Sequence, residues 1–245
     1  MNLPETKITL STSEGPMVVH CFAPATPVSG RLPAIILLQE AFGVNPHIKR
    51  TGQRMADAGY IVFAPELFHR SGAGLEFGYD EFPKIKPIFS ALTNAQMLED
   101  LRVTFAHLEK SSEVDPVRIA VWGFCLGGWA TMLAACNLPI AAALSFYGGG
   151  LVNPRPGIAF TPLLDQFGSI GCPVLLVYGG QDHGIPIEDI RTVDAKLTEL
   201  GKDHEVEIYP DAGHGFCCED RASYHRPSAE AAWTRAINWL KAKLN

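Results

Sequence analysis

The sequence predicts an α/β protein in which helices cover both faces of a mostly parallel central sheet. Short apolar runs rich in Val, Ile and Leu recur along the chain, and segments of helical composition separate most of them. Strands that are apolar throughout need cover on both faces, and parallel strands need crossover segments between them. The chain has 245 residues, of which 47% are hydrophobic and 19% charged, so it can bury a large core. We expect one domain over residues 1–245.

The elements follow in order along the chain. The runs Lys7–Ser11 and Met17–Phe22 flank Glu14-Gly15-Pro16 and predict an antiparallel hairpin at one edge of the sheet. Further strands are expected at residues 34–38, 60–64, 118–122, 141–146, 174–178 and, with an alternating edge pattern, 205–209. Helices are expected at about 47–58, 94–110, 126–136, 187–200 and 228–244. Two long connections, 66–93 and 148–173, are expected to form lids or pocket walls.

Charge and hydropathy disfavour nucleic acid and membranes as partners. Twenty basic and 26 acidic residues give a net charge of −6, and no block of five Lys or Arg occurs. Residues 119–154 carry no charge, but Gly and Pro leave no apolar run near the roughly 20 residues that a membrane span needs. The N-terminus has no basic head followed by an apolar stretch. We therefore expect a cytoplasmic protein, either a monomer or a small homo-oligomer.

The segment 118–129 contains the most informative pattern, an apolar strand followed by Gly123-Phe124-Cys125-Leu126-Gly127 and then a helix. A strand that turns directly into a helix strains the residue at the bend, and flanking glycines remove Cβ atoms that would collide there. The bend projects the Cys125 sulfur at the carboxyl edge of the sheet, beside a helix N-terminus that stabilises negative charge. It also leaves the Leu126 N–H free for an oxyanion. Cys125 is therefore a candidate nucleophile, against the alternative of a buried cysteine in a Gly-rich turn.

Two further side chains follow later strands. Asp182 comes after the strand at 174–178, and His214, between two glycines, follows the strand at 205–209. Taken alone, Asp182 could equally be a turn or helix-cap residue. The order Cys125, Asp182, His214 is nevertheless the nucleophile, acid, histidine order of α/β-hydrolases. We interpret the three residues as a catalytic triad.

The loop after the strand at 34–38 carries another group of candidates. The Ala41 N–H is a candidate second oxyanion donor, because hydrolases of this order draw one from the third-strand loop. Glu40 lies beside it, where the carboxylate could either cap the next helix or contact the thiol. Phe42 and Trp129 are candidate substrate contacts.

Metal or cofactor binding is not predicted. The other histidines do not occur with Cys or Glu at the spacing of metal ligands, and the six cysteines include no C-x-x-C pair. The vicinal pair Cys217-Cys218 could bind metal or oxidise, although burial is the simpler interpretation.

These motifs together resemble the dienelactone hydrolase family over nearly the whole chain. The resemblance is carried by Gln39-Glu40-Ala41-Phe42-Gly43, by the Cys125 turn, by Gly180-Gln181-Asp182 and by Gly213-His214-Gly215-Phe216. It implies a Cys125 nucleophile, a His214 base and acid, and an orienting Asp182. It also implies that Glu40 holds the thiol at rest and accepts its proton when substrate enters. The implied reaction hydrolyses a small-molecule lactone or ester through an acyl-thioester, without a cofactor.

One position departs from the family pattern. Where the family type has an arginine for the substrate carboxylate, four residues after the histidine, this chain has Cys218. Arg221, Arg70 and Lys84 are the candidate cations in its place, and an uncharged ester or a different lactone is an equally open substrate. For the function as a whole, two further alternatives stay open: the same triad acting on a peptide, thioester or organophosphate, and a non-catalytic protein in which Cys125 senses oxidation.

Overall fold

The protein folds around one eight-stranded sheet. The computed structural model describes residues 5–25 and 30–244. The strand order is β1-β2-β4-β3-β5-β6-β7-β8. The strands are β1 (Thr6–Thr12), β2 (Gly15–Phe22), β3 (Leu32–Leu38), β4 (Ile61–Pro65), β5 (Val114–Phe124), β6 (Ala142–Phe146), β7 (Val174–Gly179) and β8 (His204–Tyr209).

The direction of the strands confirms the predicted fold class. β1 and β2 form an antiparallel hairpin, and β2 joins the sheet antiparallel to β4. All pairs from β4 through β3 to β8 are parallel. The carboxyl ends of the parallel strands therefore lie along one edge of the sheet, where open α/β folds place their ligands.

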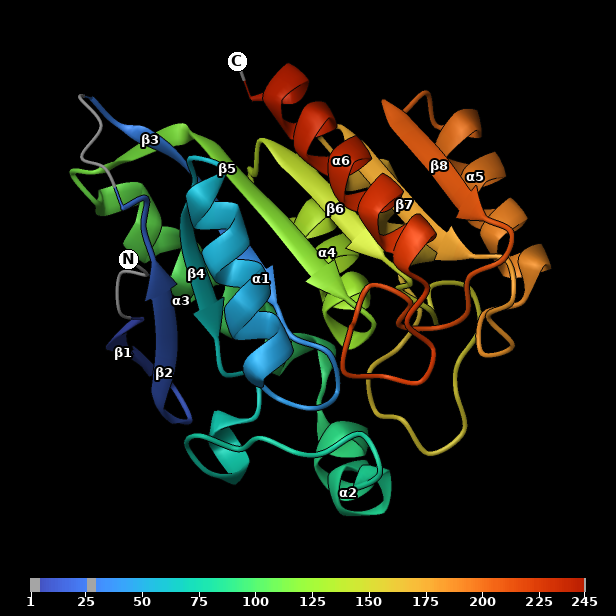
Figure 1. Ribbon diagram of the computed structural model, residues 1–245, viewed down its shortest axis with the longest axis horizontal. Coiled ribbons are helices and arrows are strands. Elements are labelled where there is room, and N and C mark those ends of the chain that lie inside the picture. Colours follow the sequence, from blue (N-terminus) through green and yellow to red (C-terminus); the bar gives the residue numbers. More distant parts are fainter. Residues whose placement is uncertain (1–4, 26–29, 245) are drawn as a thin grey trace.

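Helices cover both faces of the sheet (Figure 1). The helices are α1 (Pro46–Asp57), α2 (Phe82–Ala91), α3 (Asn94–Lys110), α4 (Leu126–Asn137), α5 (Ile187–Glu199) and α6 (Arg226–Lys243). α1 and α6 lie on one face, whereas α3, α4 and α5 lie on the other, with α4 against β5 and β6. α2 lies beyond the carboxyl edge of the strands.

The uncharged stretch 119–154 forms the centre of the core. β6 is buried along its whole length, and Trp122 of β5 and Trp129 of α4 are fully buried. α4 is buried on all sides because it lies between the sheet, α3 and the 3₁₀ turn Leu164–Ser169. An all-round apolar helix is what such a position requires. Among the described helices, none has the length and apolar character that crossing a bilayer demands.

The sequence-based elements differ from the structure in one main respect. No helix is predicted in the connection 66–93, but it contains α2. Pro83 and Pro87 obscure this helix in the sequence, because proline in a helix interior removes a hydrogen bond. Pro83 is tolerated in the first turn, where its missing N–H would have had no partner.

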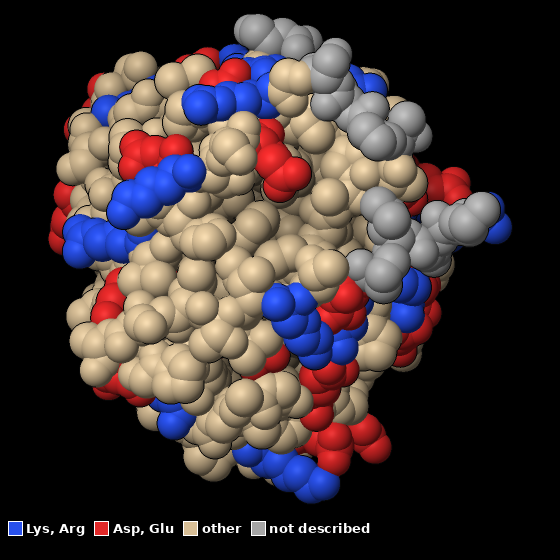
Figure 2. Space-filling model, turned by 90° about the vertical axis from the view of Figure 1, so that its left-hand side faces the viewer, with Lys and Arg blue, Asp and Glu red and all other residues tan. Residues whose placement is uncertain are grey.

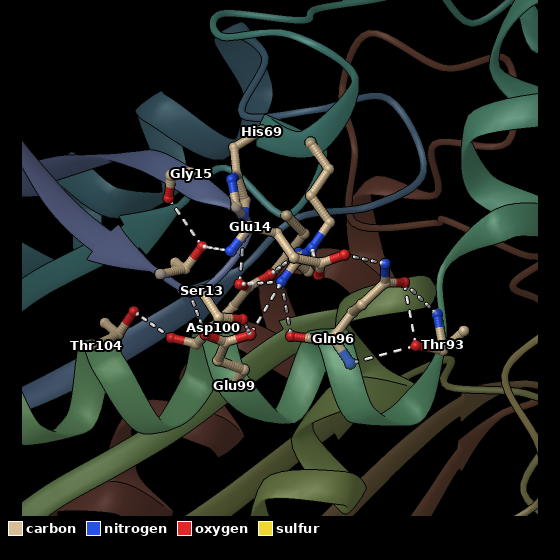
Figure 3. Close-up of polar contacts among 12 residues, drawn as sticks. Ser13, Glu14, Gly15, His69, Thr93, Gln96, Glu99, Asp100 and Thr104 are labelled. Carbon is tan, nitrogen blue, oxygen red and sulfur yellow. Dashed lines mark hydrogen bonds and ion pairs between the residues drawn. The ribbon is translucent and has the colours of Figure 1, made fainter.

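Polar contacts fasten the β1–β2 hairpin to α3 (Figure 3). In the turn, Ser13 donates to Glu99 through both its N–H and its hydroxyl. Asp100, which is fully buried, lies 3.1 Å from His69 Nε2 and accepts from the Arg70 guanidinium at 2.7 Å. These contacts fix the start of the 66–93 connection against the sheet. On the side of the molecule seen in Figure 2, basic and acidic side chains are interspersed, so neither sign dominates.

A capping box begins α3, and its removal is expected to lower stability. Thr93 Oγ1 accepts from the Gln96 N–H at 3.3 Å, and Gln96 Oε1 accepts from the Thr93 N–H at 3.1 Å. Thr93→Ala should lower the free energy of unfolding by about 1 kcal/mol in urea denaturation, because it leaves a helix donor without its cap. Thr93→Ser keeps the hydroxyl and should stay close to the wild type. Equal stability of the alanine variant would contradict this role.

Candidate active site

Cys125 occupies a strained turn between β5 and α4. Its backbone has φ 53° and ψ −110°, a conformation that is unusual for a residue other than glycine. The flanking glycines make the turn possible. A Cβ on Gly123 would lie 2.1 Å from the Gly127 carbonyl oxygen, and one on Gly127 would lie 2.3 Å from the Leu38 carbonyl oxygen. The pattern of glycines seen in the sequence is thus required by close backbone packing.

Backbone hydrogen bonds lock this turn to its neighbours. The Cys125 N–H donates to the Phe146 carbonyl at 2.9 Å, and the Gly127 N–H donates to the Gln39 carbonyl at 2.9 Å. Within the described residues, the Leu126 and Ala41 N–H groups have no hydrogen-bond acceptor. Both residues line the same cavity as Cys125. This is the arrangement that two oxyanion donors need, and they remain predicted for that role.

His214 and Asp182 meet Cys125 at this edge of the sheet. His214 Nε2 lies 3.1 Å from Cys125 Sγ, and His214 Nδ1 lies 2.6 Å from Asp182 Oδ2. The Asp182 carboxylate is fully buried, and its other oxygen accepts from the Gly184 N–H at 2.8 Å. Residues that are 89 and 32 positions apart in the chain therefore form one hydrogen-bonded row. The structure brings together the three residues that the sequence singled out.

The two loops that carry the acid and the histidine are tied to each other. The Gln181 N–H donates to the Ala212 carbonyl at 2.8 Å, and the Gly180 N–H donates to the Tyr209 carbonyl at 2.7 Å. The Tyr147 ring, which follows β6, lies edge-on to the His214 imidazole with 5.2 Å between ring centroids. The imidazole is thus held both along its hydrogen bonds and against its face.

The environment of His214 favours its protonated form. Burial lowers the pKa of the imidazole, but the negative charges of Cys125 and Asp182 and the hydrogen bonds to both raise it to about 10. At neutral pH the imidazole therefore keeps its proton and faces the Cys125 sulfur. A thiolate is the nucleophilic form of cysteine.

Glu40 lies behind the turn and is paired with Arg221. The Glu40 carboxylate is fully buried, and its Oε1 accepts from Arg221 Nη1 at 3.2 Å. Its Oε2 is buried without a hydrogen-bond partner among the described residues. The structure shows no hydrogen bond between Glu40 and Cys125. The thiol-activating role of Glu40 stays a prediction.

A cavity of about 530 Å³ opens over Cys125. Its apolar wall comes from α2, α4 and the connection after β6, and its cations are Arg155 and Arg221. The aromatic residues of the wall are Phe82, Phe89, Trp129, Tyr147 and Phe160. Pockets of this size hold small organic molecules. The two connections expected to be pocket walls therefore both contribute to it.

Not all of the predicted substrate contacts lie in this cavity. Trp129 and Arg221 line it, but Phe42, Arg70 and Lys84 do not. Arg70 is engaged by Asp100 and Glu14 at the hairpin, and Lys84 is 70% exposed beside Glu81. Phe42 packs edge-on against Tyr79, 4.6 Å between ring centroids. Basic character alone could not distinguish a cation held by an internal acid from one that faces the site.

Arg155 and Tyr147 are two of the cavity residues that the sequence analysis did not single out. Arg155 Nη2 donates to the Gly184 carbonyl at 3.1 Å, and no described carboxylate forms an ion pair with it. A Cβ on Gly149 would lie 2.2 Å from Arg155 Nη2, so the glycine leaves room for this guanidinium. Tyr147 has φ 41°, a second strained residue directly after a strand. In the sequence, the only sign of this arrangement was the glycine run 148–150. Glycines leave room there for the side chain of an arginine further along the same connection.

The side chains that commonly bind metals are not clustered in the described part of the chain. No group of three or more His, Cys, Asp or Glu side chains there is arranged to hold a metal ion. Cys217 and Cys218 are both free thiols, and Cys218 Sγ lies 2.9 Å from the Tyr79 hydroxyl.

The mostly parallel sheet, the strained turn and the hydrogen-bonded row of Cys125, His214 and Asp182 at its edge are the features of an α/β-hydrolase. The sequence model of the dienelactone hydrolase family matches residues 19–244, and the chain belongs to this family of hydrolases. A Synechocystis protein provisionally assigned as a carboxymethylenebutenolidase is 34% identical over 223 residues, which are 90% of each chain. An Escherichia coli K12 protein with the same provisional assignment is 35% identical over 86% of this chain and 78% of its own.

Solved structures agree with this assignment. The crystal structure of a provisionally assigned dienelactone hydrolase from Klebsiella pneumoniae has a TM-score of 0.88 and 31% identity, and covers 97% of this chain and 98% of its own. A dienelactone hydrolase-like promiscuous phosphotriesterase from metagenomic libraries has a TM-score of 0.80 at 22% identity, with 98% of this chain and 99% of its own covered. The second likeness concerns the fold.

His214 is expected to keep its proton far into alkaline pH. Its pKa is raised to about 10 by two anionic neighbours, so the proton should be lost only as pH rises through that value. Removing either anion by Cys125→Ala or Asp182→Asn should lower the pKa, as measured by NMR titration of the imidazole nitrogens. Cys136→Ala, at the opposite end of α4, should leave the titration unchanged. A wild-type imidazole that titrates near 6.5 would contradict this electrostatic picture.

Proposed function

We propose that the protein hydrolyses lactones or small carboxylic esters through an acyl-thioester on Cys125. The observation that carries this proposal is the 3.1 Å contact between Cys125 Sγ and His214 Nε2, with Asp182 on the other imidazole nitrogen. The relatives assigned as carboxymethylenebutenolidases support a lactone or ester substrate. The size of the cavity supports a small one.

Acylation begins with the Cys125 thiolate. The sulfur attacks the carbonyl carbon, a C–S bond forms, and the π electrons move to the carbonyl oxygen, where the Leu126 and Ala41 N–H groups donate to it. When the tetrahedral intermediate collapses, the C–O bond to the alkoxide breaks. His214 gives its Nε2 proton to the leaving alkoxide, which remains tethered to the acyl group when the substrate is a lactone.

Deacylation uses the imidazole that acylation has left neutral. His214 Nε2 takes a proton from water while the water oxygen attacks the thioester carbonyl carbon. Collapse breaks the C–S bond, releases the carboxylic acid and restores the thiolate and imidazolium. Asp182 keeps its charge and holds the ring in one orientation throughout.

Glu40 is proposed to accept the proton of Cys125 when the thiol is in its neutral form. Its unpartnered, fully buried oxygen is a site that a proton would satisfy. Its other oxygen accepts from Arg221, the cation for which an anionic substrate would compete.

The two arginines of the cavity favour a substrate with a carboxylate. Arg221 is already paired with Glu40, whereas Arg155 has no carboxylate partner among the described residues. An arginine in a partly apolar cavity is best satisfied by a planar anion. An uncharged ester would leave that capacity unused.

We also propose a cytoplasmic location, because a reducing compartment keeps a catalytic thiol from oxidising.

The nucleophile can be tested directly. Cys125→Ala should lower kcat for p-nitrophenyl acetate by at least about 10³-fold, as removal of a triad nucleophile does in hydrolases. Mass spectrometry after rapid quenching should detect the acyl adduct on Cys125 of the wild type and not of the variant. Circular dichroism should show the same fold for both.

The same assay separates turnover from thiol sensing. Asp182→Asn and His214→Ala should also lower kcat steeply, since both act on the reacting sulfur through the imidazole. Full activity of Cys125→Ala would overturn the mechanism. An unchanged kcat in both Asp182→Asn and His214→Ala would show that these side chains do not serve turnover. That result would favour the alternative in which Cys125 senses oxidation.

The carboxylate preference is tested by Arg155→Gln. It should raise KM about tenfold for dienelactone, which is a loss of about 1.4 kcal/mol in binding, and change kcat/KM for p-nitrophenyl acetate little. Lys84→Gln is the matched control, a cation of α2 that does not line the cavity. Equal effects of Arg155→Gln on both substrates would contradict carboxylate recognition.

A further inference from the structure

A second cavity lies on the face of the sheet that α1 and α6 cover (Figure 1). Its volume is about 320 Å³, and it shares no lining residue with the catalytic cavity. Its aromatic wall is formed by Trp122, Phe124 and Phe146 of the sheet and Trp233 of α6. The remaining wall includes Cys217 and Tyr224, from the segment that follows the catalytic histidine.

Two buried side chains in this wall have unsatisfied polar atoms. Trp122 is fully buried, and its indole N–H has no acceptor among the described residues. His47 is 3% exposed, and neither of its ring nitrogens makes a well-aligned hydrogen bond. Its Nδ1 lies 3.3 Å from Glu219 Oε2, close enough for an ion pair. Buried polar atoms without partners are rare in native proteins and call for a missing partner.

The wall also contains a cation without an acid partner. The Arg54 guanidinium stacks over the Trp233 ring, 3.9 Å from its centroid. No ion pair or hydrogen bond links it to the rest of the described chain. A stacked guanidinium keeps its N–H edge free, and that edge matches a carboxylate.

The acids of the wall are already paired. Glu219 accepts from Arg50 at 2.7 Å, and Glu230 accepts from Arg226 at 2.7 Å. With His47 beside Glu219, the donors that lack a partner are the Trp122 indole, which is buried, and the Arg54 guanidinium, which is exposed to solvent. A ligand that fits this cavity would therefore carry a negatively charged acceptor on a flat apolar body.

We propose that this cavity is a second ligand site, which takes a small aromatic carboxylate. The ring packs against the aromatic wall, and the carboxylate accepts from Arg54. The volume lies at the lower end of the range of about 300–1,000 Å³ for small-molecule pockets. The site does not depend on the proposed reaction, because neither Cys125 nor His214 lines it.

The location places the ligand against the catalytic segment. Between residues 213 and 224, His214 and Arg221 face the catalytic cavity, whereas Cys217, Glu219 and Tyr224 face the second cavity. An occupant of the second cavity thus contacts the segment that holds the catalytic imidazole.

Titration of the full chain with 4-fluorobenzoate, followed by ¹⁹F NMR, tests the site. Arg54→Gln should weaken binding at least tenfold, whereas Arg54→Lys, which keeps the charge but loses the stacked planar guanidinium, should weaken it less than Arg54→Gln. Arg155→Gln removes the unpaired cation of the catalytic cavity and should leave this binding unchanged. Fluorobenzamide, the uncharged analogue, should bind at least tenfold more weakly than the acid.

Several results would overturn the proposal. Binding that is lost in Arg155→Gln and kept in Arg54→Gln would place the acid in the catalytic cavity. Equal binding of the acid and the amide, or loss of binding in both Arg54 variants with an unchanged circular dichroism spectrum, would exclude recognition by charge. Absence of binding to the wild type at millimolar concentration would do the same.

Discussion

The site depends on the close approach of three backbone segments around Cys125. The β3 loop, the turn after β5 and the end of β6 are joined by the hydrogen bonds from Gly127 N–H to Gln39 and from Cys125 N–H to Phe146. Side chains larger than hydrogen at Gly123 or Gly127 would separate these segments. Leu126 and Ala41, whose N–H groups have no acceptor among the described residues, both line the cavity at this point. The strain at Cys125 is thus sustained by the same packing that places these two predicted oxyanion donors beside it.

The segment between β8 and α6, residues 210–225, contributes side chains to both cavities. It supplies the imidazole at His214 and the cation at Arg221, and the latter neutralises the buried Glu40. Cys217, Glu219 and Tyr224 of the same segment line a second cavity, together with residues of α1 and α6. Because the segment is irregular, its position is set by these contacts and not by a helix or strand of its own. A displacement of this segment at one cavity would therefore also move residues that line the other.

The sequence was sufficient for the fold and for the catalytic row because both depend on local patterns. Apolar strands separated by helices indicated the mostly parallel sheet. Cys125 directly follows β5, and Asp182 and His214 lie in the loops after β7 and β8. Long-range pairing was not readable in this way. Arg70 and Arg155 look alike in the sequence, yet Asp100 and Glu14 engage the first, whereas the second reaches the cavity past Gly149 and Gly150. The helix α2 was hidden by its prolines, although its Phe82 and Phe89 complete the cavity wall.

Electrostatics explains why a buried acid and a buried imidazole can coexist with a reactive thiol. Asp182 and Glu40 are both fully buried carboxylates, and each is compensated by a different cation. His214 compensates Asp182 and the sulfur together, whereas Arg221 compensates Glu40. An anionic substrate adds one further charge, and Arg155 is the cation in the cavity without a described acid to match it. Arg155 is therefore the cation with which a carboxylate substrate would pair, without competing with an acid of the described chain.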